Sequence, residues 1–393
     1  MNYIEQLAKR PSVQAALRSF NDKLEQIVAL AIAVQQVPAP TFAEAERAAF
    51  VQSRFEVLGL VDLFQDELCN VYGRYPGIDP QHPPLIISAH TDTVFAADTD
   101  LTIRHEPPLI YGPGLGDNAT GVAGILWLAQ TLSDFGLQPA ADCWFVANVG
   151  EEGLGDLRGM RAVVDHFGDQ ATYIVVEGGL FGQIAHQAIG VRRFRIQVKA
   201  PGGHSWGSFG NASAIHELGR IITNISYITV PAEPKTTYNV GVIEGGTTIN
   251  SIAQTAHLLL DLRSEDETEL ARLVQTVERI VAKANGGRNG RSDGVTITME
   301  LIGNRPAGQI SREATLVQWA EAALRVVGCE EISYIGGSTD ANIPLSRGLT
   351  AVCIGLTHSG NAHRLDEYID PTHLPQGLGQ LLLLTLAAAN WQN

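Results

Sequence analysis

The chain has 393 residues, of which 42 are acidic and 27 are basic, and its formal net charge at pH 7 is -15. This length exceeds the size at which a single hydrophobic core stops growing, so we expect two domains or one large domain with an insertion. The negative charge repels phosphate backbones and anionic lipid headgroups, which argues against nucleic acid and membrane surfaces as partners.

The cysteines and the first residues of the chain indicate a reducing compartment. Cys69, Cys143, Cys329 and Cys353 are widely spaced and form no CxxC pair, which is typical of free thiols. The first twenty residues mix charges and lack the apolar core of a signal peptide, and the apolar run at 381–389 is too short to span a bilayer. We therefore expect a cytoplasmic protein.

Helical and strand-like segments alternate along most of the chain. In chain order we expect helices at 13–36 and 41–58, a first strand at 85–89, a helix at 120–133, a strand at 143–149, a helix at 158–167 and a strand at 173–177. The alternation resumes with a helix at 312–327, a strand near 331–335, a helix or loop at 340–347, a strand at 349–355 and a helix at 374–390. This pattern predicts an α/β fold with a mainly parallel sheet and helices on both faces.

A different pattern interrupts this alternation. The interrupting segments are a strand at 192–200, a helix at 211–225, strands at 236–243 and 254–264, a helix at 266–284 and a strand at 295–301. The order β-α-β-β-α-β is that of a ferredoxin-like α+β domain. We take GQIAHQAIG and GNRPAG as its boundaries and expect one domain of residues 1–189 and 305–393, with a second domain of residues 190–304 inserted into it.

Polar residues follow four of the predicted strands, at the point where each strand ends. They are His90 and Asp92, the pair Glu151 and Glu152, Glu177, and the histidines His358 and His363. Ligands of open α/β sheets bind outside the carboxyl ends of the strands, so we expect these clusters to converge on one crevice. Asp117, in GDNATG, begins the next helix and can reach the same crevice.

Each cluster also has a simpler interpretation. His90 and Asp92 point to the same face of a strand, so the pair either orients a metal-binding imidazole or only caps the strand end. Glu151 and Glu152 fit a solvated acidic loop, but adjacent carboxylates at a buried strand end require cations. Because the clusters occur together, we favour a site for two divalent metal ions, and zinc, cobalt or manganese suits these ligands.

The order of the motifs resembles that of a known enzyme family. HTDTV, GDNATG, GEEG, a lone acid after a hydrophobic strand, GGH and HRLDE follow one another along the chain. They resemble the motifs of the co-catalytic dinuclear zinc exopeptidases and amidohydrolases, which include aminoacylase, peptidase T, succinyl-diaminopimelate desuccinylase and the glutamate carboxypeptidase of pseudomonads. The resemblance covers essentially the whole chain and implies a hydrolase of amide bonds, in which the inserted domain is a lid that forms a homodimer.

The resemblance implies a set of ligands for two zinc ions. His90, Asp117 and Glu177 would bind the first ion, and Asp117 would bridge to a second ion held by Glu152 and His363. The peptide bond after the bridging aspartate would be cis, as it is in the family. In the family, a glutamate follows the last metal ligand by four residues. His363 and Glu367 fit this pattern, whereas His358 has no such glutamate and is expected to be a loop histidine rather than a ligand.

The resemblance also implies catalytic and substrate-binding residues. Asp92 would orient the first histidine, and Glu151 would be the general base that carries a proton from water to the leaving amine. His204, which could otherwise be a solvated loop histidine, would reach the active site of the partner subunit. Asn250 and Arg305 would hold a substrate carboxylate, a task that suits the planar guanidinium.

These residues favour a peptidase over the other classes considered. The favoured substrates are small peptides, cleaved by a peptidase T-like or carboxypeptidase-like exopeptidase, and the alternative substrates are N-acyl amino acids. A two-metal phosphoesterase would use similar ligands but would present more basic residues to its substrate than Arg305. A non-catalytic, metal-stabilised binding protein would not need Glu151.

Overall fold

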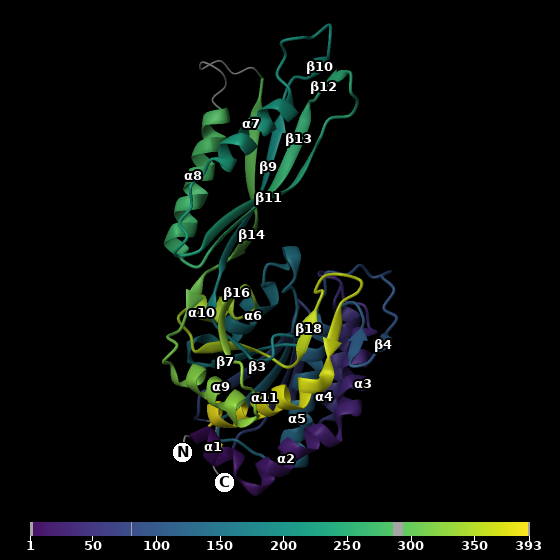
Figure 1. Cartoon of the computed structure of the whole chain (residues 1–393), viewed down its shortest axis with the longest axis vertical. Coiled ribbons are helices and arrows are strands. Elements are labelled where there is room, and N and C mark those ends of the chain that lie inside the picture. The colour runs from purple at the N-terminus through teal and green to yellow at the C-terminus, as the bar shows by residue number, and fades with distance from the viewer. Residues whose placement is uncertain (1–2, 80, 286–293, 392–393) are drawn as a thin grey trace. The chain divides into compact units, whose positions relative to one another are not determined.

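The computed structural model describes residues 3–79, 81–285 and 294–391. These residues form two compact units (Figure 1). The first unit comprises Met1–Ala188 and Gln309–Asn393, and the second comprises Ile189–Gly308. Arg305, which the sequence assigns to the first domain, ends a strand of the second unit.

The first unit is built around a mixed sheet with the strand order β1-β2-β6-β3-β7-β17-β8-β15, in which β16 also pairs with β8. In chain order its strands are β1 (Val61–Gln65), β2 (Val71–Tyr75), β3 (Leu85–His90), β6 (Cys143–Asn148), β7 (Thr172–Glu177), β8 (Gln183–Ala188), β15 (Gly308–Gln309), β16 (Ser333–Gly337) and β17 (Ala351–Gly355). The neighbours β6, β3, β7 and β17 run parallel and are almost completely buried. The predicted parallel sheet is confirmed, and its apolar runs reflect burial on both faces.

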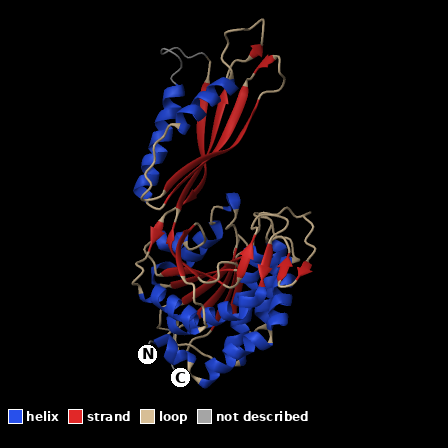
Figure 2. Cartoon of the chain, in the orientation of Figure 1, coloured by secondary structure: helices blue, strands red, loops and turns tan. Residues whose placement is uncertain are grey.

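Helices cover both faces of this sheet (Figure 2). Leu85 and Ile87 of β3 pack in one hydrophobic cluster, whereas Ile86 between them packs in another. This alternation follows from the two-residue period of a strand. The helices of the first unit are α1 (Tyr3–Ala8), α2 (Pro11–Asp22), α3 (Leu24–Gln35), α4 (Ala45–Val57), α5 (Thr120–Asp134), α6 (Arg158–Phe167), α9 (Thr315–Val326), α10 (Asn342–Ser346) and α11 (Leu374–Ala388).

The second unit has the element order β-α-β-β-α-β. Its main elements are β9 (Gly190–Lys199), α7 (Ala214–Ser226), β11 (Thr236–Gly245), β13 (Thr255–Ser264), α8 (Glu267–Asn285) and β14 (Thr296–Arg305). The strands form an antiparallel sheet in the order β11-β13-β9-β14, which is the ferredoxin-like order. Leu218 and Ile221 of α7 and Val277 of α8 pack against Ile196 and Leu258 of the sheet, so this unit has its own core.

A smaller sheet in the first unit supports the last predicted metal ligand. Its strands, in spatial order, are β18 (His358–Gly360), β19 (Tyr368–Asp370), β5 (Leu109–Tyr111) and β4 (Arg104–Glu106). The chain between β18 and β19 carries His363, whose backbone φ is 66°. None of the helices in the described residues is both long and apolar enough to cross a membrane.

Two predictions about the elements are wrong. The helix expected at 13–36 is interrupted at Lys23, which ends α2 and precedes α3. Two strands, β1 and β2, precede the one expected to be first, because β1 is an exposed edge strand without an apolar run. The segment GQIAHQAIG, taken as a domain boundary, contains β8, and the two units divide directly after this strand, between Ala188 and Ile189.

We expect Gly355→Ala to destabilise the first unit. A Cβ atom at this last residue of β17 would lie 1.9 Å from Gly179 O and 2.3 Å from Leu180 C, in the turn after Glu177. Overpacking of this kind lowers the free energy of unfolding by about 1–3 kcal/mol. Urea denaturation followed by tryptophan fluorescence measures this loss.

The matched control is Gly337→Ala, at the end of β16. The new methyl group would lie 3.6 Å from Thr339 Cγ2, an ordinary van der Waals distance. We expect almost no change in the urea midpoint of this variant. Equal midpoints for the two variants would show that the turn after Glu177 yields without cost.

Candidate metal centre and active site

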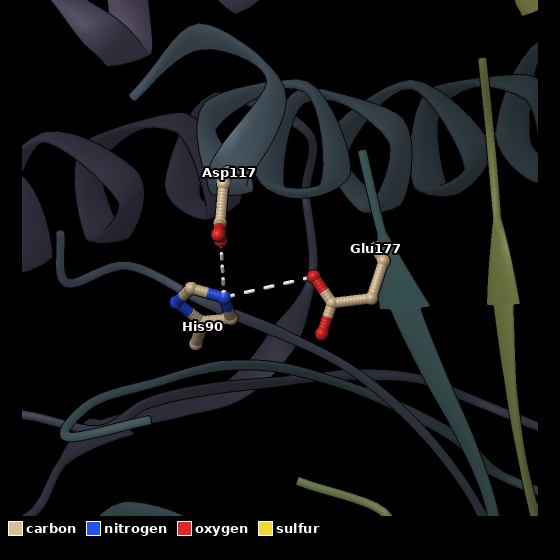
Figure 3. Close-up of side chains that lie close together, drawn as sticks. All are labelled: His90, Asp117 and Glu177. Carbon is tan, nitrogen blue, oxygen red and sulfur yellow. Dashed lines mark ion pairs between the residues drawn. The ribbon is translucent and has the colours of Figure 1, made fainter. Parts of the chain in front are cut away.

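Two parallel strands and one turn bring together the first group of possible ligands. His90 ends β3, Glu177 ends β7, and Asp117 lies in the irregular turn before α5. His90 Nε2 is 3.1 Å from Asp117 Oδ1 and 3.6 Å from Glu177 Oε2 (Figure 3). An imidazole nitrogen that faces two carboxylates in this way is a donor set suited to a divalent transition metal.

The second group uses the other oxygen of the same aspartate. His363 Nε2 is 3.2 Å from Asp117 Oδ2 and 3.1 Å from Glu152 Oε1. Within the described residues, both groups have their ligand atoms within 4.8 Å of one another. Asp117 therefore lies between two sites, which is the position of a bridging carboxylate.

The protonation equilibria of these side chains show a strongly negative local potential. Hydrogen bonds with Asp117 and Glu152 raise the pKa of His363 to about 10. Burial opposes a charge on His90, but hydrogen bonds with neighbouring carboxylates outweigh it and raise the pKa of this imidazole well above its ordinary value. Burial raises the pKa of Glu177, and His90 offsets this only in part. The same potential favours bound cations.

Asp92 connects the ends of β3 and β6. Its carboxylate accepts hydrogen bonds from the backbone N–H groups of Glu151 and Glu152, both at 3.0 Å, and from Thr41 Oγ1 at 2.9 Å. His90 Nδ1 lies closer to the backbone oxygen of Asp92, at 3.1 Å, than to its carboxylate, at 3.5 Å. The carboxylate therefore fixes the Glu151–Glu152 backbone, and both the carbonyl and the carboxylate of Asp92 lie close to the His90 imidazole.

Glu367 fixes the turn that carries Asp117. Its carboxylate accepts hydrogen bonds from the backbone N–H groups of Gly114, Gly116 and Asp117, at 3.2, 2.8 and 3.0 Å. Burial raises the pKa of Glu367 to about 7, against the effect of these hydrogen bonds. The peptide bond between Asp117 and Asn118 is cis, as the resemblance implies.

The side chain of Asn118 joins this turn to the strand of Glu177. Asn118 Nδ2 donates to the carbonyl of Val176 at 2.9 Å, and Asn118 Oδ1 accepts from Gly178 N at 2.7 Å. Asp117 and Glu177 are thus held at a fixed separation by their immediate neighbours.

The remaining predicted residues lie in the second unit. His204 is in β10 (Gly203–His204), which pairs with β12 (Ser251–Ile252), and Ser205 N donates to Asn250 O at 3.0 Å. His204 and Asn250 are therefore neighbours, and both are exposed. Arg305 is buried at the end of β14, opposite Val191 near the start of β9, in the separate four-stranded sheet of this unit. The predicted site residues of the first unit lie together in one cluster. They are His90, Asp92, Asp117, Glu151, Glu152, Glu177 and His363.

Sequence reasoning missed several side chains that build the cluster. Neither Thr41 nor Asn118 belongs to a sequence pattern with a recognised metal-binding or catalytic spacing. The only signals for them in the sequence are the short segments PTF and GDN, in which they lie. His358, which the sequence assigns to a loop, lies in β18 and packs against Phe181 and His373.

Comparison with known proteins identifies the family. A family model described as peptidase family M20/M25/M40 matches residues 86–386, which include every residue of both ligand groups. The chain belongs to this family. Its members are metal-dependent hydrolases, so the chain is a metallopeptidase or amidohydrolase.

Three similar proteins illustrate the relationship. The curated protein YqjE of Bacillus subtilis, described as uncharacterized, is 23% identical over 81% of this chain and 86% of its own length. The aminopeptidase PepT of Bacillus cereus is 19% identical, with a TM-score of 0.75 over 93% of this chain and 99% of its own. A tripeptidase of Staphylococcus aureus is 21% identical, with a TM-score of 0.76 over 93% and 98%. The two solved structures confirm the fold.

We expect Glu367→Ala to lower both stability and metal affinity. The change leaves two buried backbone N–H groups, of Gly114 and Gly116, and the partly buried N–H of Asp117 without their acceptor, at a cost of about 1–3 kcal/mol for each buried donor left unsatisfied. Thermal denaturation measures the stability, and titration of the metal-free protein with zinc measures the affinity.

Asp165→Ala is the control for loss of a carboxylate. Asp165 is exposed and pairs with Arg347 at 2.7 Å, a surface ion pair that contributes at most about 1 kcal/mol. We expect this variant to match the wild type in both measurements. A Glu367 variant with unchanged zinc affinity would mean that its carboxylate does not position Asp117.

Proposed function

We propose that this protein is a dinuclear metal-dependent exopeptidase that cleaves the amide bond of small peptides, of the peptidase T-like or carboxypeptidase-like type. The observation that carries the proposal is the Asp117 carboxylate, whose two oxygens face two different histidine–carboxylate groups. The fold shared with an aminopeptidase and a tripeptidase supports a peptide as substrate.

The ligand sets suit two divalent ions, and we propose zinc. His90, Asp117 and Glu177 would hold one ion, and Asp117, Glu152 and His363 the other. When bound, the ions polarise the amide carbonyl and make the attacking water more acidic. The residues of the chain supply the geometry and the proton transfer.

Glu151 is the general base in this proposal. It is buried and lies in neither ligand group, while its neighbour Glu152 does. Its backbone N–H donates a hydrogen bond to the carboxylate of Asp92, which lies two residues after the ligand His90. In this proposal the Glu151 carboxylate takes a proton from water and passes it to the leaving amine.

We further propose that the second unit completes the site of a partner subunit. His204 would stabilise the charge that develops on the amide oxygen, and Asn250 and Arg305 would bind a substrate carboxylate. Trp206, Phe209 and Ile249 lie near His204 and Asn250 in the chain and are almost fully exposed. Large apolar side chains of this kind are typical of a surface that is covered in an assembly, here a homodimer.

We also propose a cytoplasmic location. All four cysteines are free thiols, which is typical of proteins from a reducing compartment.

Substitution of the two adjacent glutamates tests their roles. We expect Glu151→Gln to keep both metal ions and the fold but to lose turnover by about 10²–10⁴-fold, the usual contribution of a general base. Glu152→Gln replaces a ligand oxygen, so we expect it to lose metal as well as activity. Elemental analysis of the purified proteins and a tripeptide hydrolysis assay measure the two effects.

Each variant is the control for the other, because both remove one negative charge from the same loop. Equal metal loss in the two variants would show that Glu151 is a ligand. Full turnover by the metal-loaded Glu151→Gln protein would rule out its role as the base.

Subunit mixing tests whether His204 acts across the dimer. If each site combines Glu151 of one chain with His204 of the other, a dimer of a Glu151→Ala chain and a His204→Ala chain has one complete site. Random mixing of the two inactive variants should then restore roughly a quarter of the wild-type activity, because half of the dimers are mixed.

Subunit exchange must be verified in the same sample, for example by native mass spectrometry of differently tagged chains. An inactive mixture with proven exchange would contradict the arrangement across the dimer. A monomeric wild-type protein with full activity would contradict it as well.

A further inference from the structure

A buried pair of polar side chains lies beside the metal ligands without belonging to them. Asn148, the last residue of β6, donates from Nδ2 to Asp340 Oδ2 at 2.7 Å. Both side chains are completely buried. Asp340 lies in the segment between β16 and α10, so the bond joins two parts of the chain that are far apart in sequence.

The second oxygen of each side chain has no hydrogen-bond partner. Asp340 Oδ1 and Asn148 Oδ1 are both buried, and neither is bonded to another of the described residues. A proton shared by these two oxygens would give both of them a hydrogen-bond partner. Buried polar atoms are rarely left unpaired, because each costs free energy.

The surroundings of Asp340 disfavour a carboxylate. The charged groups that act on it are His90 of β3, Glu177 of β7 and Asp92, two of which are acidic, and the Cys353 thiol of β17 adds no positive charge. Burial raises the pKa of Asp340 to about 7, Glu177 and Asp92 act in the same direction, and His90 and the bond from Asn148 oppose them. An ionised group there would have a single amide N–H to stabilise it.

We propose that Asp340 is a neutral carboxylic acid that donates its proton from Oδ1 to Asn148 Oδ1. The two side chains then form a closed acid–amide ring, in which the acid O–H donates to the amide oxygen and the amide N–H donates to the acid carbonyl. This ring satisfies both oxygens that otherwise lack a donor.

The ring makes Asp340 a positioning residue for the metal-binding strand ends. Asn148 lies opposite His90 in the β3–β6 pairing, and its backbone oxygen accepts two bonds from Thr91, from N at 2.7 Å and from Oγ1 at 3.0 Å. Glu151 follows three residues later. A side chain that fixes Asn148 therefore fixes the strand ends that carry the first histidine and the proposed base.

The neutral form also suits the charge of the site. A carboxylic acid forms both hydrogen bonds of the ring without placing a charge on a completely buried side chain. The proposal concerns the scaffold of the site, so it does not depend on which peptide is cleaved.

Substitution of Asp340 by an amide tests whether the pair functions without a negative charge. Asp340→Asn can rebuild the ring, because its new N–H₂ donates to Asn148 Oδ1 and its oxygen accepts from Asn148 Nδ2. We expect the metal-loaded Asp340→Asn protein to keep its melting temperature and a kcat/KM within about threefold of the wild type, and we expect Asp340→Ala to lose about tenfold or more. An Asp340→Asn variant as damaged as Asp340→Ala would overturn the proposal, because the ring would then require a charge.

A swap of the two residues provides a rescue. Asn148→Asp combined with Asp340→Asn places the acid on β6 and the amide on the other segment, so the ring is preserved. We expect the double variant to exceed Asn148→Ala in melting temperature and kcat/KM. A swap that is no better than Asn148→Ala would overturn the proposal.

Infrared spectroscopy reports the protonation state of Asp340 directly. It requires no enzyme activity and no variant in which the ring is broken. We expect the metal-loaded wild type to show the carbonyl stretch of a protonated carboxylic acid, above the amide I band, and Asp340→Asn to lack it. A difference spectrum without this band would show an ionised Asp340. Because the band is read without substrate, this result stands apart from any failure of the proposed peptidase activity.

Discussion

The position of the Asp117 carboxylate between two histidines is the constraint on which the rest of the site depends. Its oxygens lie 3.1 Å from His90 Nε2 and 3.2 Å from His363 Nε2. Further carboxylates complete each group, so the cluster holds more negative charge than its histidines can balance. Such a cluster is stable only when cations or protons neutralise it, which is why the imidazole pKa values are raised.

The fold produces this cluster through strand order. Because β6, β3, β7 and β17 are parallel neighbours, the residues after their carboxyl ends meet at one edge of the sheet. Asp117 comes from a turn, and side chains that are not ligands hold it in place. Glu367 binds its backbone from the side of the smaller sheet, and Asn118 binds it to the strand of Glu177. Hydrogen bonds from residues that are not ligands therefore orient the ligands, as is typical of metal centres.

The strand ends could be predicted from the sequence, whereas the bonds that support them could not. Apolar runs mark β3, β6, β7 and β17, and the polar residues after them are visible without a structure. β1 and β8 lack such runs because one is an exposed edge strand and the other is partly buried, so periodicity does not reveal them. The bond between Asn148 and Asp340 joins residues 192 positions apart, and no local pattern indicates such a pairing. Residues of the second unit, such as His204, were assigned by resemblance, and their roles stay predictions.

The most direct test of the account is the number of metal ions that each chain binds. Calorimetric titration of metal-free protein with zinc should show two equivalents per chain, one for each of the ligand groups that share Asp117. His363→Ala should retain one tight equivalent, and Asp117→Ala should lose tight binding at both sites. A single equivalent in the wild type, or two tight equivalents in the Asp117→Ala protein, would contradict the bridging role of this residue.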